Sequence, residues 1–238
     1  MATALIFAGG TGVRMNTRAK PKQFLELHGK PIIIYTIEHF EKHLEIDNIL
    51  VVCVEHWIHE LKHLVKKYSF EKVSSIIPGG NSGSKSIYNG LKALEGKCKP
   101  DEIILIHDGV RPLINSELIS ANIAKVKESE TAITVEAVTE SVVRLNGHRK
   151  ITEVPPREKM FAAKAPQSFR YDSIWDLYQR AASDGVESVD SAHLCSIYGV
   201  EMHTVQSAPN NIKITSASDY YVFRALYEAM ENEQILGM

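Results

Sequence analysis

Short runs of apolar residues alternate along this chain with longer stretches in which apolar positions recur at helical spacing. The short runs predict buried strands, and the longer stretches predict amphipathic helices between them. The expected strands are residues 3–8, 48–54, 73–77, 102–107 and 131–138, and the expected helices are residues 31–43, 56–68, 84–95 and 115–128. This alternation indicates an α/β fold with a mostly parallel central sheet.

The stretch that follows has a different pattern. Two short runs, residues 141–145 and 150–154, flank Asn146-Gly147, which is a strong signal for a β-hairpin. A two-stranded ribbon alone is only marginally stable in water. We therefore expect this arm, at about residues 139–160, to reach across a dimer partner.

The last part of the chain returns to alternating elements. The pattern predicts helices near residues 171–183 and 190–197, a strand at residues 200–206 and a closing helix near residues 216–232. Ser216 is expected to cap the closing helix, with Asp219 at the capping-box position.

Length, charge and cysteine content narrow the class of protein. With 238 residues, of which 44% are hydrophobic, the chain is expected to form a single domain over residues 1–238. A net charge of −2 does not favour nucleic-acid binding, so any anion site must be local. The three cysteines lack C-x-x-C spacing, and the chain has neither a secretion signal nor an apolar run near the length of about 18 residues that a membrane span needs. We expect a cytoplasmic protein with no membrane contact.

The most informative chemistry lies at the amino terminus. The first strand runs into Ala8-Gly9-Gly10-Thr11-Gly12, and a basic segment follows with Arg14, Arg18, Lys20 and Lys22. Glycines at the end of a buried strand let backbone N–H groups approach an anion, because no Cβ stands in the way. Four cations exceed what a single phosphate needs, so the pattern predicts a triphosphate site. The alternative is a turn with a purely structural role.

Two common nucleotide motifs do not fit this segment. Gly10-Thr11-Gly12 begins a G-x-G-x-x-G pattern, but Met15 stands where the third glycine should be. No Gly-Lys-Ser/Thr follows, so the segment is not a Walker loop either.

A second motif, His59-Glu60-Leu61-Lys62-His63, matches the H-E-x-x-H signature of zinc peptidases. The apolar stripe of this helix runs through Trp57, Ile58, Leu61, Leu64 and Val65, which places His59 and Glu60 on the opposite, wet face. A catalytic zinc needs a third ligand and a shielded cavity. We therefore interpret the motif as a solvated helix face.

Two further segments follow expected strands, namely the Pro78-Gly79-Gly80 turn and the His107-Asp108 pair. In open α/β sheets, ligands bind beyond the carboxyl ends of the strands. These segments and the amino-terminal glycine loop are therefore expected to line one crevice.

Four sequence elements resemble the cytidylyltransferases that activate sugar-alcohol phosphates. They are the glycine loop with Pro21-Lys22-Gln23-Phe24, the segment His107-Asp108-Gly109-Val110-Arg111-Pro112, the segment Ala165-Pro166-Gln167-Ser168-Phe169, and the segment Asn211-Ile212-Lys213-Ile214-Thr215. They occur in family order and span nearly the whole chain. The resemblance implies a Rossmann-like nucleotidyltransferase fold and Mg²⁺-dependent transfer of CMP from CTP to a polyol phosphate.

The resemblance also implies roles for individual residues. It places Arg14, Lys22 and Lys213 beside the phosphates as catalytic cations, and it makes Asp108 the Mg²⁺ ligand, in keeping with the preference of Mg²⁺ for carboxylates and phosphate oxygens. It assigns nucleotide binding to the glycine loop and Asp108 and cytosine recognition to Gly79, Gly80 and Ser86. Acceptor binding falls to Arg111, Ser141 and Arg157, and Arg157 would come from the neighbouring subunit of a homodimer.

Departures from the family pattern affect the expected acceptor. Gly83 stands where an arginine is usual, Ala165 and Val189 replace threonines, and Glu140 replaces an aspartate. The Ala8-Gly9-Gly10 loop and the Ala165–Phe169 stretch resemble the ribitol-phosphate branch of the family, which implies D-ribitol 5-phosphate as acceptor and hence wall or capsule synthesis. The alternative is 2-C-methyl-D-erythritol 4-phosphate and isoprenoid synthesis. From other classes, a zinc hydrolase and a non-catalytic nucleotide-binding regulator stay open.

Overall fold

The computed structural model describes residues 1–9, 20–208 and 210–236, with side chains in the last helix described as far as residue 232. Seven strands form one sheet in the order β11-β7-β10-β6-β1-β4-β5. Their bounds are β1 Ala2–Ala8, β4 Asn48–Cys53, β5 Val73–Pro78, β6 Ile103–Asp108, β7 Thr131–Ala137, β10 Phe161–Arg170 and β11 Thr204–Gln206. The strands β1, β4, β5 and β6 pair in parallel, as do β7 and β11, which confirms the mostly parallel sheet.

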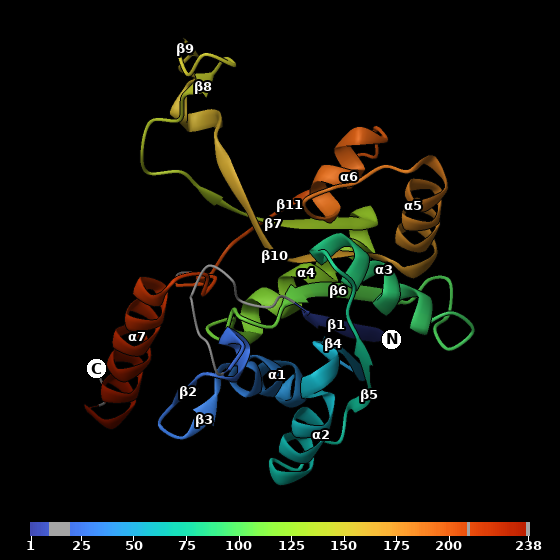
Figure 1. Cartoon of the computed structure of the whole chain (residues 1–238), viewed down its shortest axis with the longest axis vertical. Helices are drawn as coiled ribbons and strands as arrows, with labels where there is room; N and C mark the ends of the chain where they lie inside the picture. The colour runs from blue at the N-terminus through green and yellow to red at the C-terminus, as the bar shows by residue number, and fades with distance from the viewer. Residues whose placement is uncertain (10–19, 209, 237–238) are drawn as a thin grey trace.

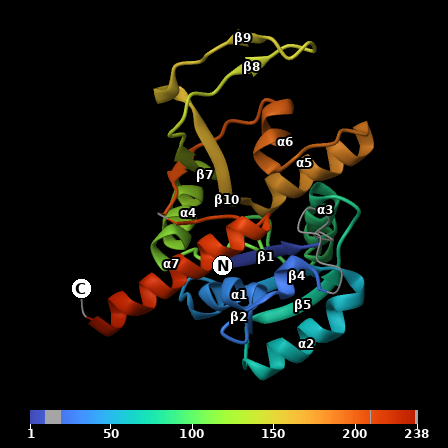
Figure 2. The same cartoon turned by 60° about the vertical axis from the view of Figure 1, so that its left-hand side comes forward.

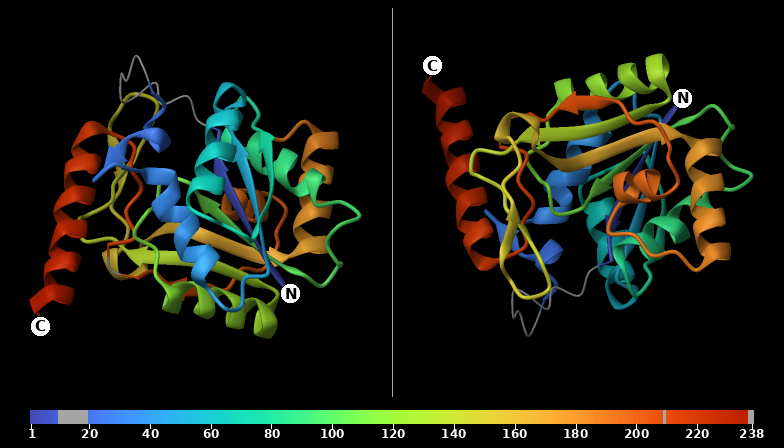
Figure 3. Two further views of the ribbon diagram at one scale, coloured as in Figure 1. Left: turned by 90° about the horizontal axis from the view of Figure 1, so that it is seen from below. Right: turned by 90° about the horizontal axis from the view of Figure 1, so that it is seen from above.

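Helices cover both faces of this sheet (Figures 1 and 3). On one face the buried core includes residues of α1 (Ile32–Lys42), α2 (Ile58–Lys67) and α4 (Ser116–Ser129). On the other face it includes residues of α3 (Gly83–Ala93), α5 (Tyr171–Asp184) and α6 (Ser191–Ile197). The strands and helices predicted from apolar spacing are thus confirmed, with ends that differ by a few residues.

The strand β10 was not predicted. It runs antiparallel to β6 on one side and to β7 on the other, and its register with β7 shifts between Ala163 and Gln167. Between these two pairs β10 has three residues and β7 has only one, so β10 forms a bulge at Lys164–Pro166. This segment has no regular alternation because its first part is exposed and its second part is buried on both faces. A period-based prediction therefore finds no strand there.

The closing helix α7 (Ala217–Leu236) lies along one side of the molecule (Figure 2). Ser216 Oγ accepts a hydrogen bond from Asp219 N at 3.3 Å, and Asp219 Oδ2 accepts one from Ser216 N at 2.7 Å. This reciprocal pair confirms the predicted capping box. The buried Phe223 of α7 joins a third apolar cluster with α1 and the short hairpin of β2 (Glu26–Leu27) and β3 (Lys30–Pro31).

The predicted arm is present and projects away from the sheet (Figure 1). Its strands, β8 (Arg144–Leu145) and β9 (Ile151–Glu153), are shorter than expected, and the turn between them is longer than the two residues that Asn146-Gly147 indicates. Asn146 O accepts a hydrogen bond from Arg149 N at 2.9 Å, and Arg149 rather than Gly147 adopts a positive φ of 60°. In a longer loop the change of chain direction is spread over more residues. Two consecutive residues with positive φ, which a two-residue turn requires, are therefore not needed.

The described residues also form three short 3-10 helices, namely η2 (Lys22–Phe24), η3 (Glu55–Trp57) and η4 (Arg157–Lys159). In the described part of the chain, no helix is both long and apolar enough to cross a bilayer. The cysteines Cys53, Cys98 and Cys195 carry free thiols.

The H-E-x-x-H motif lies on α2, where Leu61 and Leu64 are buried and His59, Glu60 and His63 are exposed. The predicted orientation of this helix is therefore confirmed, and the motif is part of a solvated surface.

Candidate active site

Three strands end at one edge of the sheet and bring distant segments together. The ends of β1, β5 and β6 supply Gly9, the Gly79-Gly80 turn and Asp108. A chamber of about 330 Å³ opens at this edge, and its lining includes Gly9, Lys22, Gly80, Asp108 and Lys213. The convergence predicted from strand ends is therefore confirmed. Gly10, Thr11, Gly12 and Arg14 lie outside the described residues.

The ends of β1 and β5 approach each other closely because both carry glycine. A Cβ on Gly9 would lie 2.7 Å from Ser86 Oγ, and a Cβ on Gly79 would lie 3.0 Å from the same atom. Ser86 Oγ itself accepts a hydrogen bond from Gly80 N at 3.1 Å and donates one to Ser82 O at 2.8 Å. Ser86 is 1% exposed and belongs to the wall of the chamber, where its hydroxyl holds the glycine turn in place.

The segment that carries Lys22 is fixed by its neighbours. Gln23 Nε2 donates a hydrogen bond of 2.6 Å to Ala8 O, at the end of β1. The ring of Phe24, which is 2% exposed, stacks on Trp57 with 4.5 Å between the ring centroids. These contacts place the half-buried Lys22 in the wall of the chamber.

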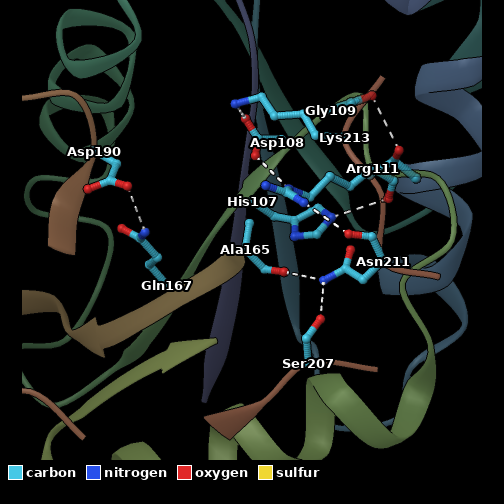
Figure 4. Close-up of polar contacts among 11 residues, drawn as sticks. His107, Asp108, Gly109, Arg111, Ala165, Gln167, Asp190, Ser207, Asn211 and Lys213 are labelled. Carbon is cyan, nitrogen blue, oxygen red and sulfur yellow. Dashed lines mark hydrogen bonds and ion pairs between the residues drawn. The ribbon is translucent and has the colours of Figure 1, made fainter. Parts of the chain in front are cut away.

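Asp108 lies between two cationic side chains (Figure 4). Lys213 Nζ lies 2.6 Å from Asp108 Oδ1, and Arg111 Nε donates to Asp108 Oδ2 at 2.8 Å. Burial of Asp108 alone would raise the pKa of its carboxyl group, but Lys213 and Arg111 outweigh this effect and hold the pKa below its ordinary value. The group is therefore a carboxylate at neutral pH.

A second chamber, of about 340 Å³, adjoins the first. Phe7, Gly83, Asp108 and Lys213 line both chambers, so the Asp108–Lys213 ion pair stands where they meet. The second chamber is further lined by Arg111, Ala165, Val189, Gln167 and Asp190, among other residues. Gly83 lies at this junction, and a Cβ there would meet nothing within 4 Å. Space is thus open where the family usually has an arginine.

Gln167 and Asp190 are site residues that the sequence did not single out. Gln167 Nε2 donates to Asp190 Oδ2 at 3.2 Å, and Gln167 Oε1 accepts from Ala192 N at 2.9 Å (Figure 4). Asp190 Oδ1 also accepts from His193 N, as the N-cap of α6. Both residues lie in or beside motifs of the family, but only the folded chain shows that their side chains meet at the second chamber.

The structure separates two predicted acceptor residues from the rest. Ser141 and Arg157 lie on the arm, where both are exposed, and neither lines the two chambers of its own chain. Arg157 Nη1 donates to Thr139 O at 3.2 Å. Arg111, by contrast, is 7% exposed, lines the second chamber and directs Nε at Asp108 and Nη1 at Asn211 O.

Similarity to known proteins agrees with this geometry. Residues 2–228 match the family described as 2-C-methyl-D-erythritol 4-phosphate cytidylyltransferase (IspD). The chain belongs to this cytidylyltransferase family. It is 48% identical to a ribitol-5-phosphate cytidylyltransferase from Streptococcus agalactiae, over the full length of both chains. It is 33% identical to a 2-C-methyl-D-erythritol 4-phosphate cytidylyltransferase from Clostridium botulinum, covering 96% of this chain and 98% of the relative.

The fold also matches that of a solved structure. The crystal structure of 4-diphosphocytidyl-2C-methyl-D-erythritol synthase from Anaerococcus prevotii matches this cytidylyltransferase with a TM-score of 0.82 and 23% identity. The match covers 96% of this chain and 98% of that chain. The predicted fold class, a Rossmann-like nucleotidyltransferase with a hairpin arm, is confirmed.

The stability of this cytidylyltransferase should depend on pH through His107, which precedes Asp108. Complete burial lowers the pKa of His107 to about 3, so the ring stays neutral in the folded protein while it becomes charged below about pH 6.5 in the unfolded chain. Its contribution is therefore fully present above pH 6.5 and is lost as pH falls toward 3.

We expect the free energy of unfolding of the natural chain to fall more steeply between pH 6.5 and 5 than that of His107→Gln, by up to about 1.4 kcal/mol per pH unit. Urea unfolding at several pH values measures this difference. His59→Gln, at an exposed site on α2, is the matched control and should keep the slope of the natural chain. Equal slopes for the natural chain and His107→Gln would refute the assignment.

Proposed function

We propose that this enzyme transfers CMP from CTP to D-ribitol 5-phosphate and releases pyrophosphate. The observation that carries the proposal is a pair of adjoining chambers that meet at one carboxylate and one lysine, Asp108 and Lys213. Transfer between two substrates requires that they meet in the right orientation, and two adjoining chambers would allow this.

The first chamber suits the nucleotide. Its glycine-lined floor allows close contact with the backbone, and Lys22 and Lys213 supply positive charge for the phosphates. Arg14 is assigned to the same phosphates by its place in the family motif. Gly79, Gly80 and Ser86 border the cytosine end, where Ser86 holds the turn that would read the base.

The second chamber suits the acceptor. A phosphomonoester is mostly a dianion at neutral pH, since its second pKa is about 6, so no general base is needed to activate it. Catalysis then consists of positioning the acceptor phosphate and stabilising charge on the α-phosphorus and on the leaving pyrophosphate. The ribitol acceptor is supported by the 48% identity to the Streptococcus agalactiae relative, against 33% to the Clostridium botulinum relative.

Asp108 also suits a divalent cation. In the described part of the chain, no group of three or more acidic, histidine or cysteine side chains could hold a metal ion. Mg²⁺, however, commonly binds through one or two carboxylates, with phosphate oxygens and water as the other ligands. Asp108 fits this role because its carboxyl group stays ionised. Its Oδ1 atom is paired with Lys213, whose side chain is 41% exposed and can turn towards the phosphates instead. Bound Mg²⁺ would neutralise phosphate charge.

The arm supplies the proposed dimer contact. Its apolar side chains Val142, Val143, Leu145, Ile151 and Val154 are 38–62% exposed, which favours burial against a second copy of the chain. Such a dimer would let Arg157 of one subunit enter the acceptor chamber of the other.

A pyrophosphate-release assay tests the proposed reaction. Release should require CTP, Mg²⁺ and a polyol phosphate together, and D-ribitol 5-phosphate should give the highest kcat/KM. A preference for 2-C-methyl-D-erythritol 4-phosphate would favour the alternative acceptor. Activity lost to a zinc-selective chelator, or CTP binding without turnover on any acceptor, would contradict a cytidylyltransferase reaction.

Free cysteines are compatible with the cytoplasm that we infer as its compartment.

Replacing Gly9 with alanine should weaken CTP binding by about tenfold, because overpacking of this kind costs about 1–3 kcal/mol. The added methyl group would press on Ser86 Oγ and displace the Gly79-Gly80 turn that this hydroxyl holds. Equilibrium titration with CTP measures the effect. In the double variant Gly9→Ala/Ser86→Ala the obstructing hydroxyl is gone, so its loss of affinity should be smaller than the sum of the two single losses. An additive result would count against this packing argument.

Arg157→Ala should raise KM for the acceptor while leaving KM for CTP unchanged, because the arginine would act only in the second chamber. Initial-rate kinetics with each substrate varied in turn provide the measurement. Arg149→Ala, on the turn of the same arm, is the control and should behave like the natural chain. Unchanged acceptor kinetics in Arg157→Ala would argue against the arm as part of the site.

A further inference from the structure

Asn211 lies behind the site, two residues before Lys213, and is 1% exposed. It lines neither chamber, yet it contacts Ala165 and Arg111 in the wall of the second (Figure 4). A buried carboxamide is costly unless it makes hydrogen bonds, so its partners indicate what it does.

The side chain of Asn211 holds the wall of the second chamber. Its Nδ2 atom donates to Ala165 O at 2.7 Å and more weakly to Ser207 Oγ at 3.4 Å. Ala165 belongs to the bulge of β10 that lines this chamber, where regular pairing with β7 is interrupted. The hydrogen bond from the Asn211 carboxamide thus supports a segment that regular strand pairing does not hold.

The orientation of this carboxamide is determined by its partners. Turning it over would place Oδ1 against the carbonyl oxygen of Ala165, which cannot donate a hydrogen bond. Asn211 Oδ1 has no hydrogen-bond partner among the residues that the structure describes. The side chain therefore leaves one acceptor unsatisfied in order to direct its donor at Ala165.

The backbone of Asn211 holds the charged junction. Its carbonyl oxygen accepts a hydrogen bond of 3.0 Å from Arg111 Nη1, while Arg111 Nε donates to Asp108 Oδ2. The other oxygen of Asp108 pairs with Lys213. Asn211 thus connects the wall of the second chamber to the Asp108 carboxylate through buried hydrogen bonds.

We propose that Asn211 is a positioning residue that couples the acceptor chamber to the Asp108–Arg111–Lys213 ion pairs. It contacts neither substrate and acts through Ala165 on one side and Arg111 on the other. When the bond to Ala165 is lost, the acceptor wall moves independently of the junction, so the acceptor phosphate is held less well in line with the α-phosphorus. This inference rests on the proposed function, namely that the second chamber receives the polyol phosphate.

The decisive variant is Asn211→Asp, which preserves the shape of the side chain and replaces the Nδ2 donor with an oxygen facing the Ala165 carbonyl. We expect KM for D-ribitol 5-phosphate to rise by about tenfold to a hundredfold, because two unmatched oxygens facing each other would displace the Ala165 segment of the acceptor wall. The Kd for CTP, measured by calorimetry without acceptor, should change little. Ser207→Ala is the matched control, since it removes the weak partner of Asn211 at 3.4 Å and a local bond to Ala208 O but leaves the bond to Ala165, and it should keep the acceptor KM of the natural chain.

Several results would overturn the proposal. A folded Asn211→Asp with unchanged acceptor KM would do so, as would an equal loss of CTP affinity, which indicates a general disturbance. If Asn211→Asp does not fold, Asn211→Ser provides the same comparison without a buried charge, and failure of both to fold would assign Asn211 to folding instead. An inactive natural chain would refute the proposed function itself, whereas an active natural chain with an unaffected variant refutes only the coupling.

Discussion

Replacing Lys22 with methionine should lower kcat for CMP transfer by about 10²- to 10³-fold, as expected for the loss of one preorganised donor at a developing negative charge. Methionine retains most of the volume of the lysine stem, so the packing of Gln23 against Ala8 and of Phe24 against Trp57 should persist. The effect then reports the charge alone. Single-turnover measurements with saturating CTP separate the chemical step from binding.

Lys20→Met is the matched control for this prediction. Lys20 stands two residues earlier in the same segment, is exposed, and pairs with Glu26 at 3.0 Å outside the chamber. An exposed ion pair of this kind contributes about 0–1 kcal/mol to stability, so its loss should leave kcat close to that of the natural chain. If the two variants lose activity equally, Lys22 has no special role at the phosphates.

Asp108→Asn should have a larger effect and should act on activity and stability together. We expect kcat to fall by about 10³-fold or more, because a metal ion supplies several kcal/mol of charge stabilisation and this carboxylate is its expected ligand. Removing the charge also leaves Arg111 buried beside a neutral amide. Breaking a buried pair on one side typically costs about 3–5 kcal/mol, so the midpoint of thermal unfolding should fall as well.

Two measurements distinguish these consequences of Asp108→Asn. Thermal unfolding reports the loss of the ion pairs, while the dependence of rate on Mg²⁺ concentration reports the loss of a metal ligand. Asp47→Asn is the control, since Asp47 accepts a hydrogen bond of 2.7 Å from Ala2 N where β1 and β4 begin, at the other edge of the sheet. Normal activity in a folded Asp108→Asn would remove the carboxylate from the mechanism.

Hydrophobic spacing was sufficient to predict the elements that surround the site. The strands β1, β5 and β6 end beside glycine or at aspartate, and the rule that parallel strands present their carboxyl ends together predicts that Gly9, Gly80 and Asp108 line one crevice, as they do. The capping box of Ser216 was equally predictable, because capping depends on residues three positions apart. In each case the physical cause is local in sequence or general to the fold class.

The acceptor side of the site could not be predicted in this way. It depends on β10, which reverses direction between β6 and β7 and carries a bulge at Lys164–Pro166. Its residues are exposed at one end and buried on both faces at the other, so no single period describes it. The contacts of Gln167 with Asp190 and of Asn211 with Ala165 join residues 23 and 46 positions apart, and their motifs alone do not show which side chains meet.

The sequence by itself determined the α/β architecture, the position of the glycine loop at a strand end and the identity of the charged residues there. Those features follow from apolar periodicity, from the absence of a Cβ on glycine and from the order of the family motifs. The tertiary structure alone decided that two chambers meet at Asp108 and Lys213, that Ser86 contacts the glycine turn and Asn211 contacts Ala165, and that Ser141 and Arg157 lie away from the site of their own chain. Such features depend on side chains brought together by long-range packing, and no local pattern encodes their distances.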